Sequence, residues 1–209
     1  MLLEKERKMD IESLLEGTQD EGRVVDYQYF NLLKNRSILF NDECSEDIIE
    51  RVGIPLLNFE KDDSNAPVDL YINSQGGEVF SSLFLCNIID NYKKKLNIHI
   101  LGYALSMGGV LACAGANNPN VTKDCYPFSI GMLHAGSVSV SGTSGQSKSF
   151  MKFNDKVEAK TKSYILSHTH ISEEEYDAKN DEDWWLTAED LLSLGIVDKI
   201  IGEPISEKA

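Results

Sequence analysis

The sequence predicts a single α/β domain built around a parallel sheet, and three observations lead to this prediction. The chain has 209 residues, which is near the size of one domain and long enough to bury a core without disulfide or metal support. Hydrophobic residues make up 42% and charged residues 26%, which excludes collagen-like and wholly disordered chains. Short apolar runs alternate with helical patterns of about 10–15 residues, as in βαβ units.

The strands are predicted from apolar runs bounded by turn residues. They cover residues 36–40, 68–73, 98–103, 125–133 and 196–201. Between them, apolar residues spaced three and four apart predict helices. These helices begin near residues 45, 79, 107, 151, 173 and 187. The long helix 151–168 follows a Gly/Ser-rich ribbon, 137–147, and Pro55 is expected to kink or end the first helix.

Charge and cysteine usage narrow the class of protein. The chain has 20 Lys and Arg against 34 Asp and Glu, a net charge of −14, which repels nucleic acid and anionic lipid. We therefore expect neither a nucleic-acid partner nor a membrane. The four cysteines have no CxxC spacing, so we expect reduced thiols and a cytoplasmic location. Residues 1–25 are charged and lack an apolar signal segment, and they predict a mobile N-terminal arm.

Two strand-to-helix turns are rich in glycine. They are Ser74-Gln75-Gly76-Gly77 and Ser106-Met107-Gly108-Gly109. Such turns leave backbone N–H groups unpaired at a helix start, where they favour a developing negative charge. If the two turns meet, they could form an oxyanion hole beside a serine. Taken alone, either turn is as well explained by the need for a sharp bend.

A serine nucleophile needs a base, normally histidine. His134 ends an apolar strand, so its side chain could reach a neighbouring turn, whereas His99 lies inside a strand and is expected to be structural. His168 and His170 lack further cysteine or histidine ligands nearby, and we predict no metal site. Carboxylates are too numerous for composition alone to identify a third catalytic member.

Three segments together resemble a known family. They are L-Y-I-N-S-Q-G-G at 70–77, A-L-S-M-G at 104–108 and M-L-H at 132–134. In order and spacing they resemble the proteolytic subunit of the Clp protease. Residues 29–36 and 183–198 extend the resemblance, which covers about residues 25–201.

The resemblance implies a serine endopeptidase on a crotonase-like ββα spiral. By motif, Ser106 would be the nucleophile and His134 the general base. The backbone N–H groups of Gly77 and Met107 would form the oxyanion hole.

The third member of the triad is expected shortly before an aromatic–Leu–Thr–Ala run. Counting back from that run places Asp183 in the role. Asp181 and Asp177 are close enough to take it if the local alignment slips.

The resemblance also implies an assembly. Residues 26–209 would form the peptidase domain, with a protruding handle at about 135–168 through which two seven-membered rings stack. The N-terminal arm, 1–25, would line an axial pore. The partners would be a Clp/Hsp100-type AAA+ ATPase and polypeptide substrates. The chain has no nucleotide-binding loop, so we expect no cofactor in it and ATP use by the partner.

Three departures from the family pattern keep alternatives open. Gln75 replaces the usual proline, Asp69 stands where an aromatic residue is common, and the loop 117–120 lengthens the interval from Ser106 to His134 by about three residues. A catalytically inactive ring subunit is therefore a second hypothesis. A crotonase-type acyl-CoA enzyme is a third, although the chain lacks an evident acyl-CoA-binding segment.

Overall fold

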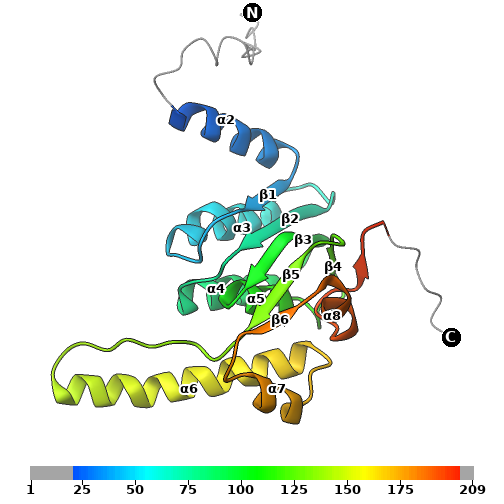
Figure 1. The fold of residues 1–209 in the computed structure, drawn as a ribbon. Coiled ribbons are helices and arrows are strands. Elements are labelled where there is room, and N and C mark those ends of the chain that lie inside the picture. Colours follow the sequence, from blue (N-terminus) through cyan, green and yellow to red (C-terminus); the bar gives the residue numbers. More distant parts are fainter. Residues whose placement is uncertain (1–20, 203–209) are drawn as a thin grey trace, which may run out of the picture.

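The computed structural model describes residues 21–202, and it confirms the predicted α/β architecture with a parallel sheet (Figure 1). The strands are β1 (Ser37–Phe40), β2 (Val68–Ser74), β3 (Leu96–Leu105), β4 (Val121–Cys125), β5 (Ile130–Leu133), β6 (Trp184–Leu186) and β7 (Lys199–Ile200). The helices are α2 (Glu21–Lys34), the π-helical segment η1 (Ile49–Gly53), α3 (Ile54–Lys61), α4 (Val79–Asp90), α5 (Met107–Cys113), α6 (Ser144–His168), α7 (Glu173–Lys179) and α8 (Ala188–Ser193).

The sheet branches at β3. Strands β1, β2, β3, β4 and β7 follow one another as parallel neighbours. The first half of β3, Leu96–Ile100, pairs with β4, whereas its last residues, Tyr103–Leu105, pair with β5. Strand β6 then runs antiparallel to β5. As a result β5 and β6 lie beside the carboxyl end of β3, where Ser106 follows.

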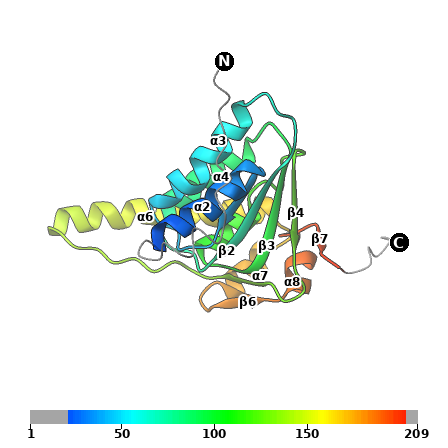
Figure 2. The ribbon, with the colours of Figure 1, turned by 90° about the horizontal axis from the view of Figure 1, so that it is seen from above.

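The core lies on one face of this sheet. Alternate residues of β2 and β3 are fully buried, as expected for strands with one covered face. They are Val68, Leu70, Ile72, Leu96, Ile98 and Ile100. Each buried aliphatic side chain contributes roughly 1.5–3 kcal/mol. Helices α3 and α4 lie along this side of the sheet in Figure 2, and Leu85 and Ile89 of α4 belong to the same core.

The long helix α6 corrects one prediction from the sequence. It begins at Ser144, seven residues before the expected start, and takes up part of the predicted ribbon. A capping box explains this start. The Thr143 hydroxyl accepts a hydrogen bond from the Gln146 N–H, and the Gln146 Oε1 accepts one from the Thr143 N–H. Much of α6 extends away from the sheet in Figures 1 and 2, and Ile165 is its buried residue.

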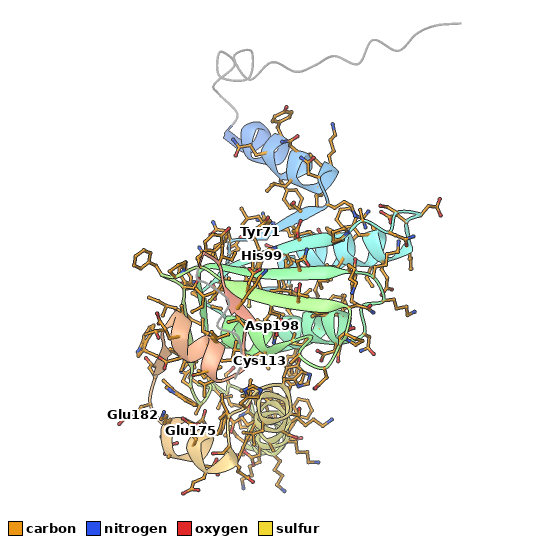
Figure 3. All side chains as sticks on the ribbon, turned by 90° about the vertical axis from the view of Figure 1, so that its right-hand side faces the viewer. Tyr71, His99, Cys113, Glu175, Glu182 and Asp198 are labelled. Atoms are coloured by element: carbon orange, nitrogen blue, oxygen red, sulfur yellow. The ribbon has the colours of Figure 1, made fainter. Side chains whose placement is uncertain are left out.

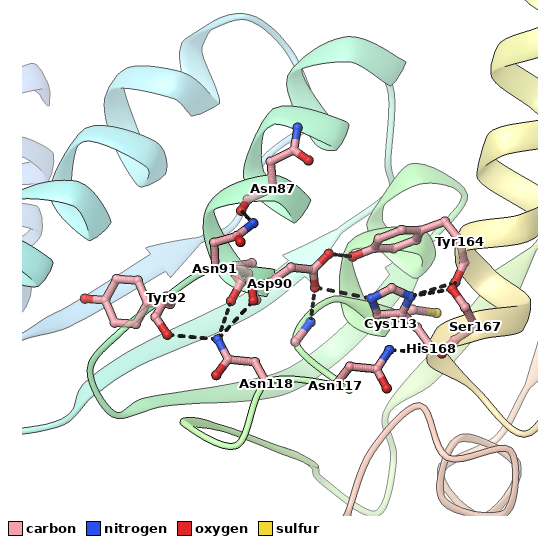
Figure 4. A network of polar contacts seen from close by, with 12 residues as sticks. Asn87, Asp90, Asn91, Tyr92, Cys113, Asn117, Asn118, Tyr164, Ser167 and His168 are labelled. Carbon is pink, nitrogen blue, oxygen red and sulfur yellow. Dashed lines mark hydrogen bonds and ion pairs between the residues drawn. The ribbon is translucent and has the colours of Figure 1, made fainter.

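A network of polar contacts connects α6 to the end of α4 (Figure 4). Asp90, the last residue of α4, accepts hydrogen bonds from the Tyr164 hydroxyl at 2.8 Å and from the Gly115 N–H at 2.7 Å. His168 stacks on Tyr164 with ring centroids 3.9 Å apart. The buried Asn118 side chain donates to three backbone carbonyls around the end of α4. The loop that lengthens the Ser106–His134 interval is therefore part of the core structure.

Other predicted boundaries moved or lie outside the described residues. Pro55 stands in the first turn of α3, which continues to Lys61, so the proline does not end the helical region. The last strand, β7, is shorter than predicted. Most of the predicted N-terminal arm, 1–20, lies outside the described residues, and α2 already begins at Glu21. Among the helices within residues 21–202, none is long and apolar enough to cross a membrane.

Candidate active site

The two glycine-rich turns meet backbone to backbone. A Cβ placed on Gly76 would lie 2.4 Å from the Leu105 carbonyl oxygen and 2.8 Å from the Met107 nitrogen. A Cβ on Gly108 would lie 2.8 Å from the Ser74 carbonyl oxygen. These distances exclude side chains, so glycine is required for the turn after β2 to contact the turn after β3. The arrangement brings the start of α4 next to Ser106.

Ser106 occupies a strained junction between β3 and α5. Its φ of 53° and ψ of −121° lie in a region that non-glycine residues rarely adopt. Such a conformation costs about 1–3 kcal/mol. The Ser106 N–H donates to the Met132 carbonyl at 2.9 Å, which ties the junction to β5. A serine on a sharp strand-to-helix turn is the geometry of a nucleophile elbow, although Ala104 replaces the first glycine of that motif.

His134 reaches Ser106 because of the register between β3 and β5. Leu105 pairs with Met132, so the residues that follow each strand lie side by side. The Ser106 Oγ and the His134 Nε2 are 2.7 Å apart, which is a hydrogen-bond distance.

Asp183 approaches the other nitrogen of the same ring. Strand β6 pairs Trp184 with Leu133, so Asp183 lies opposite His134. The Asp183 Oδ1 is 3.4 Å from the His134 Nδ1, and the Asp183 side chain is 54% exposed. Of the other two candidates, Asp177 pairs with Lys162 at 2.6 Å. Asp181 is exposed and has no hydrogen bond or ion pair to any residue between 21 and 202. The structure therefore brings Asp183, and neither alternative, to the histidine.

Two backbone N–H groups near the serine, those of Gly77 and Met107, have no acceptor among residues 21–202. Gly77 forms a parallel bridge with Cys44, in which Cys44 N–H donates to Gly76 and Glu78 N–H donates to Cys44. In this pattern the N–H of Gly77 itself points away from Cys44. Met107 is the first residue of α5, so its N–H has no partner within the helix. Neither group donates a hydrogen bond within the described part of the chain.

The start of α4 carries an unusual cap. Glu78 accepts hydrogen bonds from the Phe80 and Ser81 N–H groups at 2.8 and 2.6 Å. Burial opposes ionisation of this carboxyl, but the hydrogen bonds outweigh it and hold the pKa of Glu78 below its ordinary value. The cap fixes the helix whose first turn follows Gly77.

A cavity of about 680 Å³ adjoins these groups. Its lining includes Ser106, Met107, His134 and Gly77 together with residues of α6 and α7. Of the lining residues from α6 and α7, the sequence had singled out Asp177 as an alternative third member of the triad. Sequence reasoning missed Asp155 and Glu158 of α6, because no motif distinguishes their polar helix face from an ordinary solvent-exposed face.

The remaining histidines lie elsewhere. His99 contacts Asp124 and Asp69 on the open face of the sheet, and Figure 3 shows it with Tyr71, far from Glu175 and Glu182 near α7. His168 belongs to the network at the end of α6. No three His, Cys, Asp or Glu side chains are grouped to hold a metal ion among the described residues.

Ser106, His134 and Asp183 lie in one chain of contacts with two backbone N–H groups beside the serine, which is the arrangement that a serine hydrolase on an α/β fold requires. Comparison with known proteins identifies the family. The family model described as Clp protease matches residues 19–204. The chain therefore belongs to the Clp protease family.

Relatives with assigned names agree with this family. The chain is 28% identical over 196 residues to the ATP-dependent Clp protease proteolytic subunit 1 of Salinibacter ruber, covering 92% of this chain and 81% of the relative. It is 28% identical over 186 residues to the subunit 1 of Streptomyces avermitilis, covering 89% and 84%. It is 26% identical over 170 residues to the subunit 3 of Rhodococcus jostii, covering 81% and 83%.

Proposed function

We propose that this chain is the proteolytic subunit of an ATP-dependent protease and hydrolyses peptide bonds of unfolded polypeptides. One observation gives the proposal its main support. The Ser106 Oγ and the His134 Nε2 stand 2.7 Å apart at the edge of a cavity that can hold a peptide side chain. Family membership supports the same activity.

The proposed mechanism follows from the positions of these groups. The His134 Nε2 takes the proton from the Ser106 hydroxyl as the Oγ attacks the peptide carbonyl carbon. The N–H groups of Gly77 and Met107 stabilise the resulting oxyanion, and one such donor is worth about 10²–10³ in kcat. The imidazolium then gives its proton to the leaving amine. Water hydrolyses the acyl ester in a second round through the same base.

Asp183 acts on the ring and not on the substrate. Its carboxylate, near Nδ1, favours the tautomer that leaves Nε2 free to accept the serine proton. In the free chain the carboxylate is half exposed at 3.4 Å. We propose that substrate binding or assembly shortens this contact.

The proposed assembly is two stacked seven-membered rings enclosing the active sites. The ββα spiral of the body, the handle at 135–168 and an axial arm at 1–25 belong to this proposal. Exposed apolar side chains on α6, Phe150, Met151 and Phe153, support a contact at the handle. The relatives are named ATP-dependent, and we propose that an AAA+ ATPase partner uses the ATP while this chain holds no cofactor. We place the protein in the cytoplasm.

Covalent labelling with a fluorophosphonate tests the proposal directly. The purified protein should be labelled at Ser106, located by mass spectrometry, and should hydrolyse an unfolded protein. Ser106→Ala should abolish labelling and lower kcat by about 10³–10⁶, because the nucleophile is removed. Ser149→Ala, an exposed serine of α6, should change neither.

The second candidate, an inactive ring subunit, is favoured by the 3.4 Å separation of Asp183 from His134. It predicts no labelling of Ser106 in a preparation that assembles into large rings. That result would replace the peptidase proposal.

A further inference from the structure

Two kinds of side chain line the cavity beside Ser106. The first kind is apolar and comes from α4, α5, β5 and α6. These side chains are Val79, Met107, Val110, Leu133 and Ile165. All except the partly buried Val79 are buried, so they suit an aliphatic stem.

The second kind is acidic. Four carboxylates line the cavity, those of Glu43, Asp155, Glu158 and Asp177, against a single lysine, Lys162. Glu43 stands at the rim close to Gly77, where a Cβ on the glycine would lie 2.8 Å from the Glu43 Cγ. Asp155 and Glu158 are three residues apart on α6 and face the same side of the helix.

The lysine does not balance these charges. Its Nζ lies 2.6 Å from Asp177 and 2.9 Å from Glu173, so two carboxylates of α7 already share it. The two ion pairs raise the pKa of Lys162, which keeps it charged and engaged. Glu43, Asp155 and Glu158 make no ion pair with a cation of the described chain. The carboxylates and the lysine of the lining therefore sum to a net charge of about −3.

The spacing of lining residues along α6 indicates how long a side chain must be to reach both kinds. The apolar Ile165 and the acidic Glu158 both line the cavity. They are separated by about 10 Å along α6, at 1.5 Å per residue. A short side chain leaves the carboxylates unused, and an acidic one is repelled by them.

We propose that this cavity selects lysine or arginine at the substrate position just before the cleaved bond. The methylene stem packs on the apolar side chains of the lining, and the ammonium or guanidinium head lies among Glu43, Asp155 and Glu158. The inference rests on the proposed peptidase function and adds its substrate preference. Carboxylates that contact a bound cation in a partly excluded cavity discriminate against a neutral side chain of the same shape.

Peptidyl diphenyl phosphonates test this preference without requiring turnover or a partner ATPase. In the reaction the Ser106 Oγ forms a bond to phosphorus and the bond from phosphorus to one phenoxide breaks. The serine proton passes to His134 and from there to the phenoxide, which leaves as phenol. Three reagents differ in one side chain: lysine, norleucine, which keeps the stem without the charge, and glutamate. The readout is the second-order rate of labelling at Ser106 by mass spectrometry.

The lysine reagent should label at least about fivefold faster than the norleucine reagent, with glutamate slowest. Glu158→Gln should lower the lysine-to-norleucine ratio about two- to fivefold. Glu174→Gln is the matched control, because this exposed carboxylate of α7 does not line the cavity and its loss changes the net charge equally. It should leave the ratio unchanged.

The outcomes separate the two proposals. If norleucine labels Ser106 as fast as lysine or faster, the charge preference is wrong while the activated serine remains. If a simple fluorophosphonate fails to label Ser106, the peptidase proposal fails and the preference fails with it. Should Glu158→Gln not fold, the wild-type ratio must still fall as salt rises from about 0.05 to 0.5 M, because the attraction is screened. A ratio independent of salt would overturn the inference.

Discussion

At the residue scale, the site depends on how closely two stretches of backbone approach. Gly76 sits against the Leu105 carbonyl and the Met107 nitrogen, and Ser106 adopts its positive φ between them. The hydrogen bond to Met132 and the helix that begins at Met107 stabilise the strained backbone conformation of Ser106. The glycine therefore positions both the nucleophile and the free amides beside it.

Replacing this glycine tests that dependence. Gly76→Ala should destabilise the fold by about 2–5 kcal/mol, because the φ of +89° is strained for alanine and the Cβ meets backbone atoms. The rate of fluorophosphonate labelling at Ser106 should also fall in this variant. Gly145→Ala is the control, since nothing lies within 4 Å of its Cβ and it stands inside α6. It should stabilise the protein by about 0.5–1 kcal/mol in urea unfolding. Equal effects of the two changes would contradict this account.

Local patterns predicted some site residues and left others undetermined. Ser106 and His134 follow apolar strands beside or near glycine turns, so both could be proposed from residue type and position. Asp183 could not, because it is one of several carboxylates in an acidic stretch and its place depends on the pairing of β6 with β5. Asp155 and Glu158 of the cavity were missed because an exposed helix face looks the same whether or not a cavity adjoins it.

At the scale of elements, most strands and helices were predictable, including the short helices α7 and α8, whereas β6 and the true start of α6 were not. Strand β6 has three residues, too few to show alternation, although it sets the register of Asp183. The early start of α6 had a readable signal in Thr143 and Gln146, which have the spacing of a capping box. The glycine and serines around them favoured a ribbon instead.

Polar side chains on the neighbouring strands β2, β3 and β4 contact one another, and these contacts predict that the stability of the fold depends on pH. The His99 Nδ1 lies 2.6 Å from Asp124 and its Nε2 lies 3.3 Å from Asp69, with the Tyr71 ring stacked on it and Lys199 at 3.6 Å from Asp124. Burial lowers the pKa of His99, but the two carboxylates outweigh it and raise the pKa above the ordinary value.

Since the folded pKa is raised, the stability from His99 is full below about pH 6.5 and is lost as pH rises through the folded pKa. An NMR titration of the His99 ring should give a pKa above about 6.5. His99→Gln should flatten the pH dependence of the free energy of unfolding in this range. A His99 pKa at or below the ordinary value would show that the effect of burial outweighs that of the two carboxylates.

The loop after α5 should be a structural element and not a tolerated insertion. The Asn118 side chain donates to the carbonyls of Ile89, Asp90 and Tyr92 at 2.9–3.2 Å, so Asn118→Ala should cost about 1–3 kcal/mol in urea unfolding. Asn117→Ala removes one exposed hydrogen bond, to Ser167, and should cost less than about 1 kcal/mol. Similar losses of stability for the two variants would contradict the structural role assigned to the Asn118 side chain.

At the scale of the whole molecule, the body and α6 have different surfaces. The described chain forms one sheet with its helices, whereas α6 extends beyond it and exposes Phe150, Met151 and Phe153 (Figure 1). The ring of Phe153 also stacks on the exposed Phe80, with centroids 6.1 Å apart. An apolar group on an extended helix is typical of a contact surface between subunits.

This surface makes assembly testable. If α6 joins the proposed rings, Phe153→Glu should shift the protein from the double ring to smaller species in mass photometry, because a charge would be buried at the contact. Lys152→Glu, which introduces the same residue at the neighbouring exposed position, should shift it less. A mass unaffected by Phe153→Glu would place the ring contact elsewhere.

The branching of the sheet at β3 also has a consequence for synthesis. The ribosome makes the chain from its N-terminus, at roughly 5–20 residues per second. The serine and the histidine directly follow β3 and β5, but the carboxylate directly precedes β6 and is made after the whole of α6 and α7. A nascent chain thus carries nucleophile and base for several seconds without the group that orients the histidine. Under the proposed mechanism, proteolytic competence arises only when almost the entire polypeptide has left the ribosome.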